Sequence, residues 1–309
     1  MGSVVTGWGS SLPEKVLTNH DLEGWLDTSD EWIVERTGIS ERRVGGVTSD
    51  LAVEAAQKAL ATAGRSPADV DALIVATTTP DQAVPATAST VQEVLGLECG
   101  AFDVNAACSG FVYALVVAHG LLAIGHRCVL VVGADSLSRI TDWEDRGTAI
   151  LFGDAGGAVV LEASDEEHVL AWELSSDGSG RNLLYADVGG TMKMDGQEVF
   201  RRAVRIVVSS AETTLAQAGK TVADVALMVP HQANQRIVDA ACRRLGLPED
   251  RVVSVLEKTG NTSAASIPFA LAEAAEAGRL AAGDLVLLVG FGAGMTGASA
   301  LLRWNPPAR

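Results

Sequence analysis

The sequence predicts an α/β protein made of two related halves. Three observations predict this fold. The composition is apolar, glycine-rich and poor in aromatic residues, with 48% hydrophobic residues, 32 Gly and 5% aromatic residues. Short apolar strand patterns alternate with helical patterns, and similar segments recur in the same order. Such a composition favours close packing of helices on sheets. We place the halves at residues 1–170 and 171–309.

The recurring segments relate the second half to the first. Residues 63–75 are echoed by 218–229, residues 95–97 by 245–247, and residues 128–133 by 285–290. The separation between the copies is nearly constant, and the unit is too long for a solenoid repeat. Chance similarity between alternating helix–strand segments explains three matches in register less well than a repeat does. The two copies are therefore expected to pack as a pseudo-symmetric pair.

Local patterns place the elements of each half. Asp50 is expected to cap a helix whose alanines recur at helical spacing, and Gly64 to end it. A Thr/Pro loop at 79–85 precedes a helix that ends near Leu95. Polar, glycine-rich residues 175–196 are expected to form a mobile surface loop. The strands of the first half are expected at residues 70–78, 102–104, 127–134 and 156–162.

A cysteine precedes the most apolar segment of the first half. After Cys108 an apolar run continues to about Ala123, long enough for a helix buried on every side. Cys108 would lie at the N-terminus of that helix, where unpaired N–H groups and the helix dipole lower the pKa of a thiol. Two interpretations are open at this point: a nucleophile, or an ordinary small buried cysteine.

Two polar residues of the second half belong with Cys108. Superposing the copies places Cys108 opposite the region of Asn261, and His231 directly follows Pro230 at the end of an expected strand. Strand ends at the interface of two α/β halves converge on one cavity, so these three side chains are expected to meet there. The other histidines are expected to be structural or solvated: His20, His119, His126 and His168.

Charge and cysteine usage exclude several functions. A net charge of −16 argues against nucleic-acid binding. The 4 cysteines have neither CxxC spacing nor histidines at ligand spacing, so neither a metal site nor a disulfide framework is expected. No apolar run has membrane-spanning length and no secretory leader is evident, which predicts no membrane partner and a cytoplasmic location.

Four motifs, in order and with matching spacing, resemble those of β-ketoacyl-[acyl carrier protein] synthase III, the thiolase-fold enzymes that start fatty-acid synthesis. They are residues 103–111 (DVNAACSGF), 230–237 (PHQANQRI), 258–268 (KTGNTSAASIP) and 290–297 (GFGAGMTG). The resemblance runs from about Thr6 to Trp304. It implies a thiolase-like fold layered α-β-α-β-α, a homodimer, and no cofactor, with acyl-CoA as a substrate.

The resemblance assigns Cys108, His231 and Asn261 as a triad for decarboxylating condensation. Cys108 would take the acyl group from acyl-CoA, and backbone N–H groups of Cys108 and Gly294 would form the oxyanion hole. His231 and Asn261 would hold the enolate formed when malonyl-[acyl carrier protein] loses CO2. Elongating condensing enzymes have a second histidine in place of Asn261, and degradative thiolases have a cysteine in the 290–294 turn, so both are excluded.

The resemblance also implies where the substrates bind. The CoA residues would be Trp32, Arg36, Arg146 and Asn234. The carrier protein would dock on Gln232, Ala233, Asn234, Gln235, Arg236, Arg243 and Arg244. The acyl pocket would include Phe200 and, from a loop that crosses the dimer interface, Val84. Without the resemblance, these arginines and Trp32 would be read as an ordinary solvated surface.

Alternative functions stay open. The same triad serves a priming ketosynthase or an acyltransferase of a polyketide pathway, and a non-catalytic acyl-CoA-binding protein is an alternative of a different class. Val84 stands where acetyl-restricted relatives have a bulky aromatic residue, which predicts a branched or medium-length primer. A GxGxxG pattern at 292–297 is not a dinucleotide site, because a strand pattern rather than a helix follows it.

Overall fold

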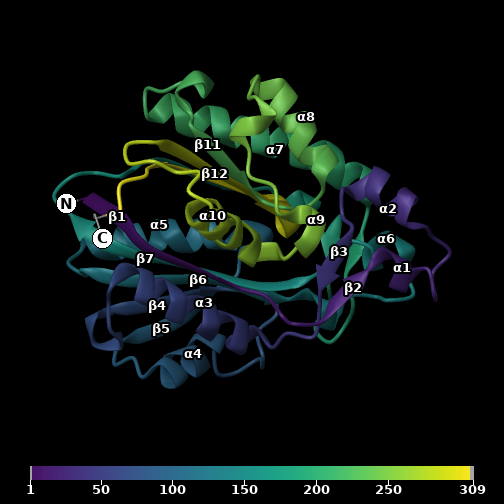
Figure 1. Ribbon diagram of the computed structural model, residues 1–309, viewed down its shortest axis with the longest axis horizontal. Helices are drawn as coiled ribbons and strands as arrows, with labels where there is room; N and C mark the ends of the chain where they lie inside the picture. Colours follow the sequence, from purple (N-terminus) through teal and green to yellow (C-terminus); the bar gives the residue numbers. More distant parts are fainter. Residues whose placement is uncertain (1, 307–309) are drawn as a thin grey trace.

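The computed structural model describes residues 2–306 and contains two main sheets with the same strand order (Figure 1). The first sheet consists of β1 (Gly2–Ser11), β7 (Asp154–Ser164), β6 (Cys128–Ser136), β4 (Ala72–Ala76) and β5 (Gly100–Val104), in that spatial order. The second sheet consists of β8 (Val169–Ser176), β13 (Thr296–Arg303), β12 (Leu285–Gly292) and β11 (Leu227–Pro230).

The pairing directions of the two sheets match as well. β1–β7 and β7–β6 are antiparallel and β6–β4 is parallel, as are β8–β13, β13–β12 and β12–β11 respectively. β5 continues the first sheet in parallel with β4. At the matching place in the second sheet, Met228 and Val252 form an isolated parallel bridge. The predicted pair of α/β repeats is confirmed, whereas their division at residue 170 stays a prediction.

Helices form three layers around the two sheets (Figure 1). α3 (Thr48–Ala63) and α4 (Thr87–Leu95) cover the outer face of the first sheet. α7 (Gly196–Gln217) and α8 (Gln235–Leu245) cover the outer face of the second. α5 (Gly110–Ala123) and α10 (Ser266–Glu276) lie between the sheets and share one buried apolar cluster with strands of both. The predicted α-β-α-β-α layering is confirmed.

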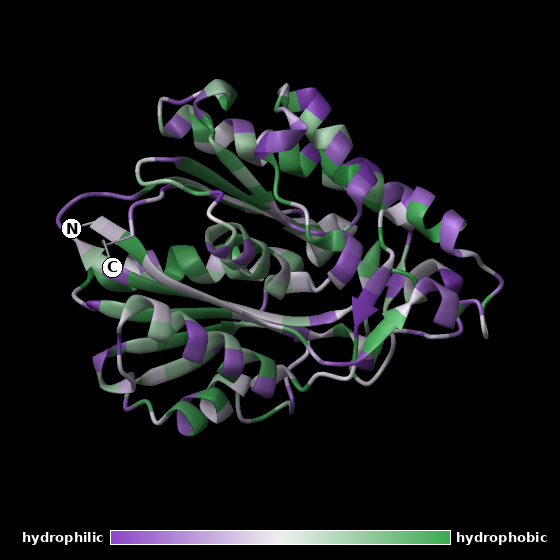
Figure 2. Cartoon of the chain, viewed as in Figure 1, coloured by the Kyte–Doolittle hydropathy of each residue, from purple (hydrophilic) through white to green (hydrophobic). Residues whose placement is uncertain are grey.

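Hydropathy explains which helix takes which layer. α5 is apolar around its whole circumference and lies between the two sheets, whereas α8 exposes hydrophilic residues on the outside of the molecule (Figure 2). A helix that is apolar all round removes its side chains from water only when other elements cover it on every side. Within residues 2–306, no helix is long and apolar enough to span a bilayer.

Short elements gather at one end of the layers (Figure 1). They are β2 (Val16–Thr18), α1 (Asn19–Leu22), α2 (Asp30–Thr37), β3 (Glu41–Arg43), α6 (Arg146–Ala149) and α9 (Leu256–Thr259). Two further short strands, β9 (Leu184–Tyr185) and β10 (Lys193–Met194), pair in an antiparallel hairpin.

Two local predictions are wrong. α3 begins at Thr48 with Val47 as its N-cap, so Asp50 lies inside the first turn instead of capping it. An acidic residue there still interacts favourably with the helix dipole, and the predicted end at Gly64 is confirmed by its left-handed conformation, with φ 66°. Residues 175–196 are not one loop, because they include the end of β8 and the β9–β10 hairpin.

Candidate active site

Two matching turns, one in each half, position two of the predicted site residues. Cys108 lies in a 3-10 turn (Ala107–Ser109) between β5 and α5, and Asn261 precedes a 3-10 turn (Ser263–Ala265) that leads into α10. Ala107 and Ser263 both adopt left-handed backbone conformations, with φ 49° and 50°. Such conformations cost about 1–3 kcal/mol and persist where the surrounding packing enforces them, often at functional sites.

Each turn packs against a glycine of the opposite half. A Cβ atom on Gly133 of β6 would lie 2.3 Å from the carbonyl oxygen of Ala264, and one on Gly290 of β12 would lie 3.1 Å from Cα of Ser109. Real Cβ atoms do not come within 3.0 Å of such atoms, so a side chain on Gly133 would displace the turn. The absence of side chains here lets the two turns approach each other between the sheets.

Cys108, His231 and Asn261 line one cavity of about 90 Å³. The three side chains predicted to converge are thus brought together, from the ends of β5 and β11 and from the turn before α10. The remainder of the lining is mostly apolar and includes Leu151, Phe152, Leu184, Met194, Val199, Phe200, Ile237 and Phe291. A small apolar cavity with a few convergent polar groups is typical of a substrate site.

His231 is held on one ring nitrogen and free on the other. Its Nδ1 lies 2.7 Å from Oγ of Ser266, and its ring meets the edge of Phe291 with centroids 5.3 Å apart. Nε2 is buried and has no hydrogen-bond partner among residues 2–306. Burial lowers the pKa of His231 to about 3, so the imidazole is neutral at physiological pH.

Asn261 is fixed through its backbone and through one end of its amide. Its N–H donates to the carbonyl of Leu151 at 2.8 Å, and its carbonyl accepts from the N–H of Gly153 at 3.0 Å. Its side-chain oxygen accepts from the N–H of Ser263 at 2.9 Å. The Nδ2 group is therefore the end of the side chain that is available to donate a hydrogen bond in the cavity.

The thiol of Cys108 does not have the lowered pKa that the sequence predicted. It is 9% exposed, and burial raises the pKa of Cys108 to about 12 even though a hydrogen bond from Ser263 acts in the opposite direction. The prediction considered the helix N-terminus alone. Desolvation of the charged form outweighs that contribution when a thiol is enclosed by apolar groups.

The glycine-rich turn after β12 closes against the backbone of Cys108. A Cβ atom on Gly292 would lie 2.7 Å from the nitrogen of Cys108, so only glycine fits. Gly294 has φ 72°, and the Thr296 hydroxyl donates to the carbonyl of Ala106 at 3.0 Å. This geometry supports backbone donors near Cys108, while the role of the Gly294 N–H in an oxyanion hole stays a prediction.

An open cleft of about 810 Å³ adjoins the cavity and gathers most of the predicted CoA residues. It is lined by Trp32, Arg36 and Asn234, and it shares Phe200 and Asn234 with the cavity. The guanidinium groups of Arg36 and Arg146 each lie 4.6 Å from the centre of the Trp32 ring. Asn234 donates to the carbonyl of Arg36 at 3.0 Å, which joins α2 to the start of α8.

The predicted docking residues divide into exposed and buried ones. Arg236, Arg243 and Arg244 are exposed on α8, and Arg236 lies over the ring of Phe200 at 5.8 Å. Gln232 and Ala233 are buried, and their assignment to a docking surface stays a prediction. Gln232 instead bonds the backbone of Pro230, Val253 and Val255. Its amide ties β11 to the 252–255 segment.

Val84 does not line the cavity of its own chain. It is 83% exposed and absent from the residues that surround Cys108. Its predicted place in an acyl pocket therefore requires a second copy of the chain. Phe200, the other predicted pocket residue, does line the cavity.

Three polar residues that the sequence analysis did not single out surround the triad. Ser266 bonds His231 and Ser263 bonds Asn261. Asp135 is fully buried and accepts hydrogen bonds from Thr77, Thr78, Thr79 and the N–H of Ala264. A polar run at 77–79 and a carboxylate at the end of an apolar strand are the sequence signals that point to such a cluster.

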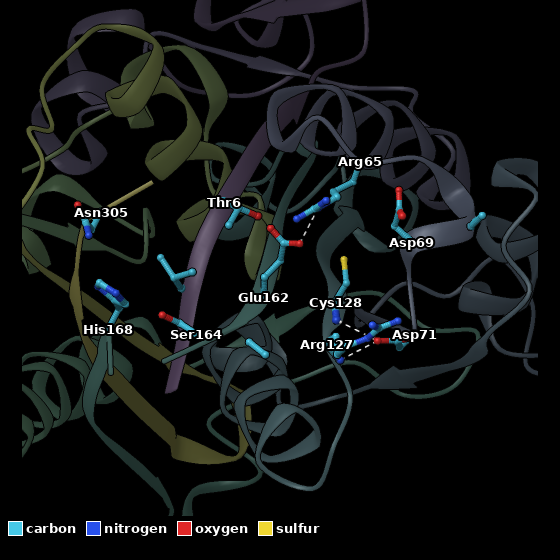
Figure 3. A pocket seen from close by; sticks show the side chains of 13 residues that line it. Thr6, Arg65, Asp69, Asp71, Arg127, Cys128, Glu162, Ser164, His168 and Asn305 are labelled. Atoms are coloured by element: carbon cyan, nitrogen blue, oxygen red, sulfur yellow. Dashed lines mark hydrogen bonds and ion pairs between the residues drawn. The ribbon is translucent and has the colours of Figure 1, made fainter. Parts of the chain in front are cut away.

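A second cleft, of about 690 Å³, shares no lining residue with the cavity or with the CoA cleft (Figure 3). Three of its charged side chains have partners: Arg65 bonds Glu162 at 2.6 Å, and Asp71 accepts from the backbone N–H groups of Arg127 and Cys128. Among residues 2–306, no three His, Cys, Asp or Glu side chains are grouped so that they could hold a metal ion.

Family comparisons match both halves of the chain. A family described as 3-Oxoacyl-[acyl-carrier-protein (ACP)] synthase III matches residues 102–178, and its C-terminal counterpart matches residues 215–304. The chain is 50% identical over 307 residues to beta-ketoacyl-[acyl-carrier-protein] synthase III 1 of Bacillus anthracis, covering 97% of this chain and 98% of that protein.

Solved structures agree with the sequence comparison. The 3-oxoacyl-[acyl-carrier-protein] synthase III of Aquifex aeolicus superposes with a TM-score of 0.95 at 45% identity, covering 98% of this chain and 100% of that one. The priming β-ketosynthase of the R1128 polyketide biosynthetic pathway also superposes with a TM-score of 0.95, at 38% identity, covering 99% of this chain and 97% of that one.

Proposed function

This chain belongs to the 3-oxoacyl-[acyl-carrier-protein] synthase III family, and from that premise we propose that it condenses an acyl-CoA primer with malonyl-[acyl carrier protein], the first step of fatty-acid synthesis. The protein is an acyltransferase of the condensing type, with the thiolase fold. The single observation that supports the proposal best is the meeting of Cys108, His231 and Asn261 in one apolar cavity.

In the first half-reaction, Cys108 accepts the acyl group. Its sulfur bonds the thioester carbon, the bond from that carbon to the CoA sulfur breaks, and the thiol proton of Cys108 leaves with CoA. The developing oxyanion lies near the backbone N–H of Cys108 and the 292–296 turn, which packs against that nitrogen. The cleft lined by Trp32 and Arg36 opens beside this cavity and suits the nucleotide end of CoA.

In the second half-reaction, the malonyl group loses CO2. The electron pair of the broken carbon–carbon bond stays on the remaining acetyl thioester, which becomes an enolate. The enolate oxygen accepts hydrogen bonds from Nε2 of His231 and Nδ2 of Asn261. The enolate carbon then attacks the acyl carbon on Cys108, the carbon–sulfur bond breaks, and the sulfur leaves as a thiolate that takes a proton from solvent. A neutral histidine suits this role, since burial lowers the pKa of His231 to about 3 and a neutral imidazole donates from one nitrogen only.

A second copy of the chain would complete the acyl pocket. β5 is an edge strand of the first sheet, and its residue Phe102 is 38% exposed. Exposed edge strands with apolar side chains are ready sites for pairing with another chain. Pairing of two β5 strands would join the first sheets of two protomers, and the loop containing Val84 lies on the same half. A cytoplasmic location stays a prediction from the sequence.

A polyketide priming ketosynthase is the second candidate. It is favoured by the superposition on the R1128 priming β-ketosynthase, although the fatty-acid synthases are more similar in sequence. Rates with a panel of acyl-CoA primers, measured against malonyl-[acyl carrier proteins] of both pathway types, would separate the two. A strong preference for a polyketide carrier protein would favour the second candidate.

Single substitutions of the triad test the proposed roles. Incubation with acyl-CoA followed by mass spectrometry should show an acyl adduct on Cys108, and Cys108→Ala should lose the adduct but retain malonyl decarboxylation. His231→Ala and Asn261→Ala should do the reverse. Unmodified wild-type protein would support the acyl-CoA-binding alternative. Loss of acylation in Asn261→Ala with decarboxylation intact would overturn the assignment of roles.

A further inference from the structure

The hydroxyl of Ser266 is the one hydrogen-bond partner that the structure gives to the His231 ring. Ser266 begins α10, is fully buried, and places its Oγ 2.7 Å from Nδ1 of His231. Its hydroxyl has no other hydrogen bond within residues 2–306. The opposite ring nitrogen, Nε2, is the buried atom without a partner, and the ring borders the cavity that contains Cys108.

The hydrogen-bond inventory of this pair decides the tautomer. A neutral imidazole has one N–H, on either Nδ1 or Nε2. If Nδ1 held the proton, it would donate to Ser266, and the buried O–H of Ser266 would be left without an acceptor. If Nε2 holds the proton, Ser266 donates to Nδ1, and the one donor left without a partner, the Nε2–H, belongs to a ring that borders the cavity. A substrate oxygen in the cavity can accept from that N–H but cannot reach the O–H of Ser266 behind the ring. Since buried donors without partners are unfavourable, the second arrangement is preferred for a site that binds such an oxygen.

We propose that Ser266 is a positioning residue that keeps His231 in its Nε2–H form, so that this nitrogen donates to the enolate oxygen of the malonyl substrate. The inference deepens the proposed function and rests on it for the identity of that oxygen. In the other tautomer, Nε2 would present a lone pair to an anionic oxygen and repel it. Ser266 thus determines whether His231 stabilises or destabilises the enolate.

The position of Ser266 adds a second reason for this role. The same short segment contains Asn261, whose amide is oriented by the N–H of Ser263, and Ser266 follows three residues after Ser263. The neighbours Ala265 and Ile267 are fully buried, so the start of α10 is tightly enclosed. One rigid segment therefore orients both side chains that donate to the enolate.

Nitrogen NMR of histidine-labelled protein reads the tautomer without any substrate. Wild-type His231 should show a protonated Nε2 and an unprotonated Nδ1. A wild-type spectrum with the proton on Nδ1 would overturn the proposal even if every variant failed to fold. Because this readout needs no activity, its failure is distinguishable from a failure of the proposed function, which would appear as absent condensation by the wild-type enzyme.

Ser266→Ala should shift the tautomer population and slow one half-reaction. Malonyl decarboxylation should fall at least about tenfold, since losing one donor to an oxyanion costs about 10²–10³ in kcat, whereas acylation of Cys108 by acyl-CoA should keep its rate. Ser266→Thr retains the hydroxyl and should restore decarboxylation. An unchanged tautomer in Ser266→Ala, or an equal loss in both half-reactions, would show a structural role only.

A matched control removes a buried hydroxyl elsewhere. Ser210 of α7 is also buried, and its hydroxyl bonds Glu173 and Ser299 away from the residues that line the cavity. Ser210→Ala should leave the spectrum of His231 and the ratio of the two half-reaction rates unchanged. A selective loss of decarboxylation in this control would mean that the ratio responds to general destabilisation, and the proposal would fail.

Discussion

Among the individual residues, Cys108 is both buried and the proposed nucleophile. Burial raises the pKa of its thiol to about 12, so the substrate-free protein at neutral pH holds the unreactive thiol. Acyl-CoA must therefore meet a thiol and not a preformed thiolate. This ordering suits a site where the departing CoA sulfur takes the proton that Cys108 loses.

Alkylation of the substrate-free enzyme tests this protonation state. Only the thiolate reacts, and its fraction rises about tenfold per pH unit below the pKa. The alkylation rate of Cys108 should therefore rise about tenfold per unit from pH 7 to pH 10, without a plateau. Cys108→Ala corrects for the three other cysteines, which are also free. A plateau near pH 8 would show a lowered pKa.

Asp135 is expected to support the whole region behind the turn before α10. Its carboxylate is fully buried and accepts from the segment 77–79 and from the N–H of Ala264. In Asp135→Asn, the NH2 group of the amide would face N–H and O–H groups that need an acceptor. Since hydrogen bonds to a charged group contribute about 1.5–3 kcal/mol each, the free energy of unfolding should fall by about 3 kcal/mol or more.

Urea unfolding of matched variants checks this expectation. Asp224→Asn removes the charge of an exposed carboxylate that accepts from Thr221, and should lower the free energy of unfolding much less than Asp135→Asn, because solvent screens exposed charges. Similar midpoints for the two variants would mean that the buried carboxylate of Asp135 contributes no more than a surface cap.

At the scale of elements, the two central strands differ in how closely the opposite turn approaches. A Cβ on Gly133 would lie 2.3 Å from a backbone oxygen, and one on Gly290 would lie 3.1 Å from a backbone carbon. Gly133→Ala should therefore lower the free energy of unfolding by more than the 1–3 kcal/mol (roughly) typical of overpacking, and reduce condensation. Gly290→Ala should be milder. Thermal unfolding and condensation rates, measured on both, would show a reversed order if the halves adjust freely.

The arginines of α8 are expected to serve two functions, carrier-protein docking and CoA binding. Arg243→Glu or Arg244→Glu should raise KM for malonyl-[acyl carrier protein] about 1.4- to fivefold, the effect of about 0.2–1 kcal/mol per exposed ion pair, and leave acylation unchanged. Arg236 also lines the CoA cleft, so Arg236→Glu should impair both half-reactions. Arg127→Glu, in the cleft of Figure 3, serves as the control. Equal effects of all four would point to net charge alone.

The sequence predicted the elements best where one pattern decided the structure. The apolar run after Cys108 predicted a helix buried on every side, and the matching segments predicted two related halves, both of which the structure shows. The prediction that Asp50 caps α3 was wrong because the helix begins two residues earlier, at Thr48, whose hydroxyl donates to the carbonyl of Thr79. The burial of Gln232 and the bond from Ser266 to His231 could not be predicted, because both depend on contacts between segments distant in the chain.

At the scale of the whole molecule, primer choice should depend on two chains. Val84 is exposed in its own chain, so Val84→Phe should change selectivity only if the loop enters a partner's pocket. Each buried CH2 of the primer contributes about 0.8 kcal/mol, so two extra carbons shift selectivity by roughly tenfold. The mutant should lose longer and branched primers and keep acetyl-CoA, measured as kcat/KM. Unchanged selectivity would remove Val84 from the pocket, and the wild-type cavity would then be set by Phe200 and its neighbours.

Because the two turns pack against each other, the active-site cavity can form only after both halves of the chain have been synthesised. Cys108 is translated early, but its cavity requires His231, Asn261 and Phe291, and its backbone meets Gly292 near the end of the chain. A ribosome-bound or truncated chain would contain the nucleophile without the pocket. The cavity around Cys108 is therefore complete only once residues of both halves have been synthesised and have folded.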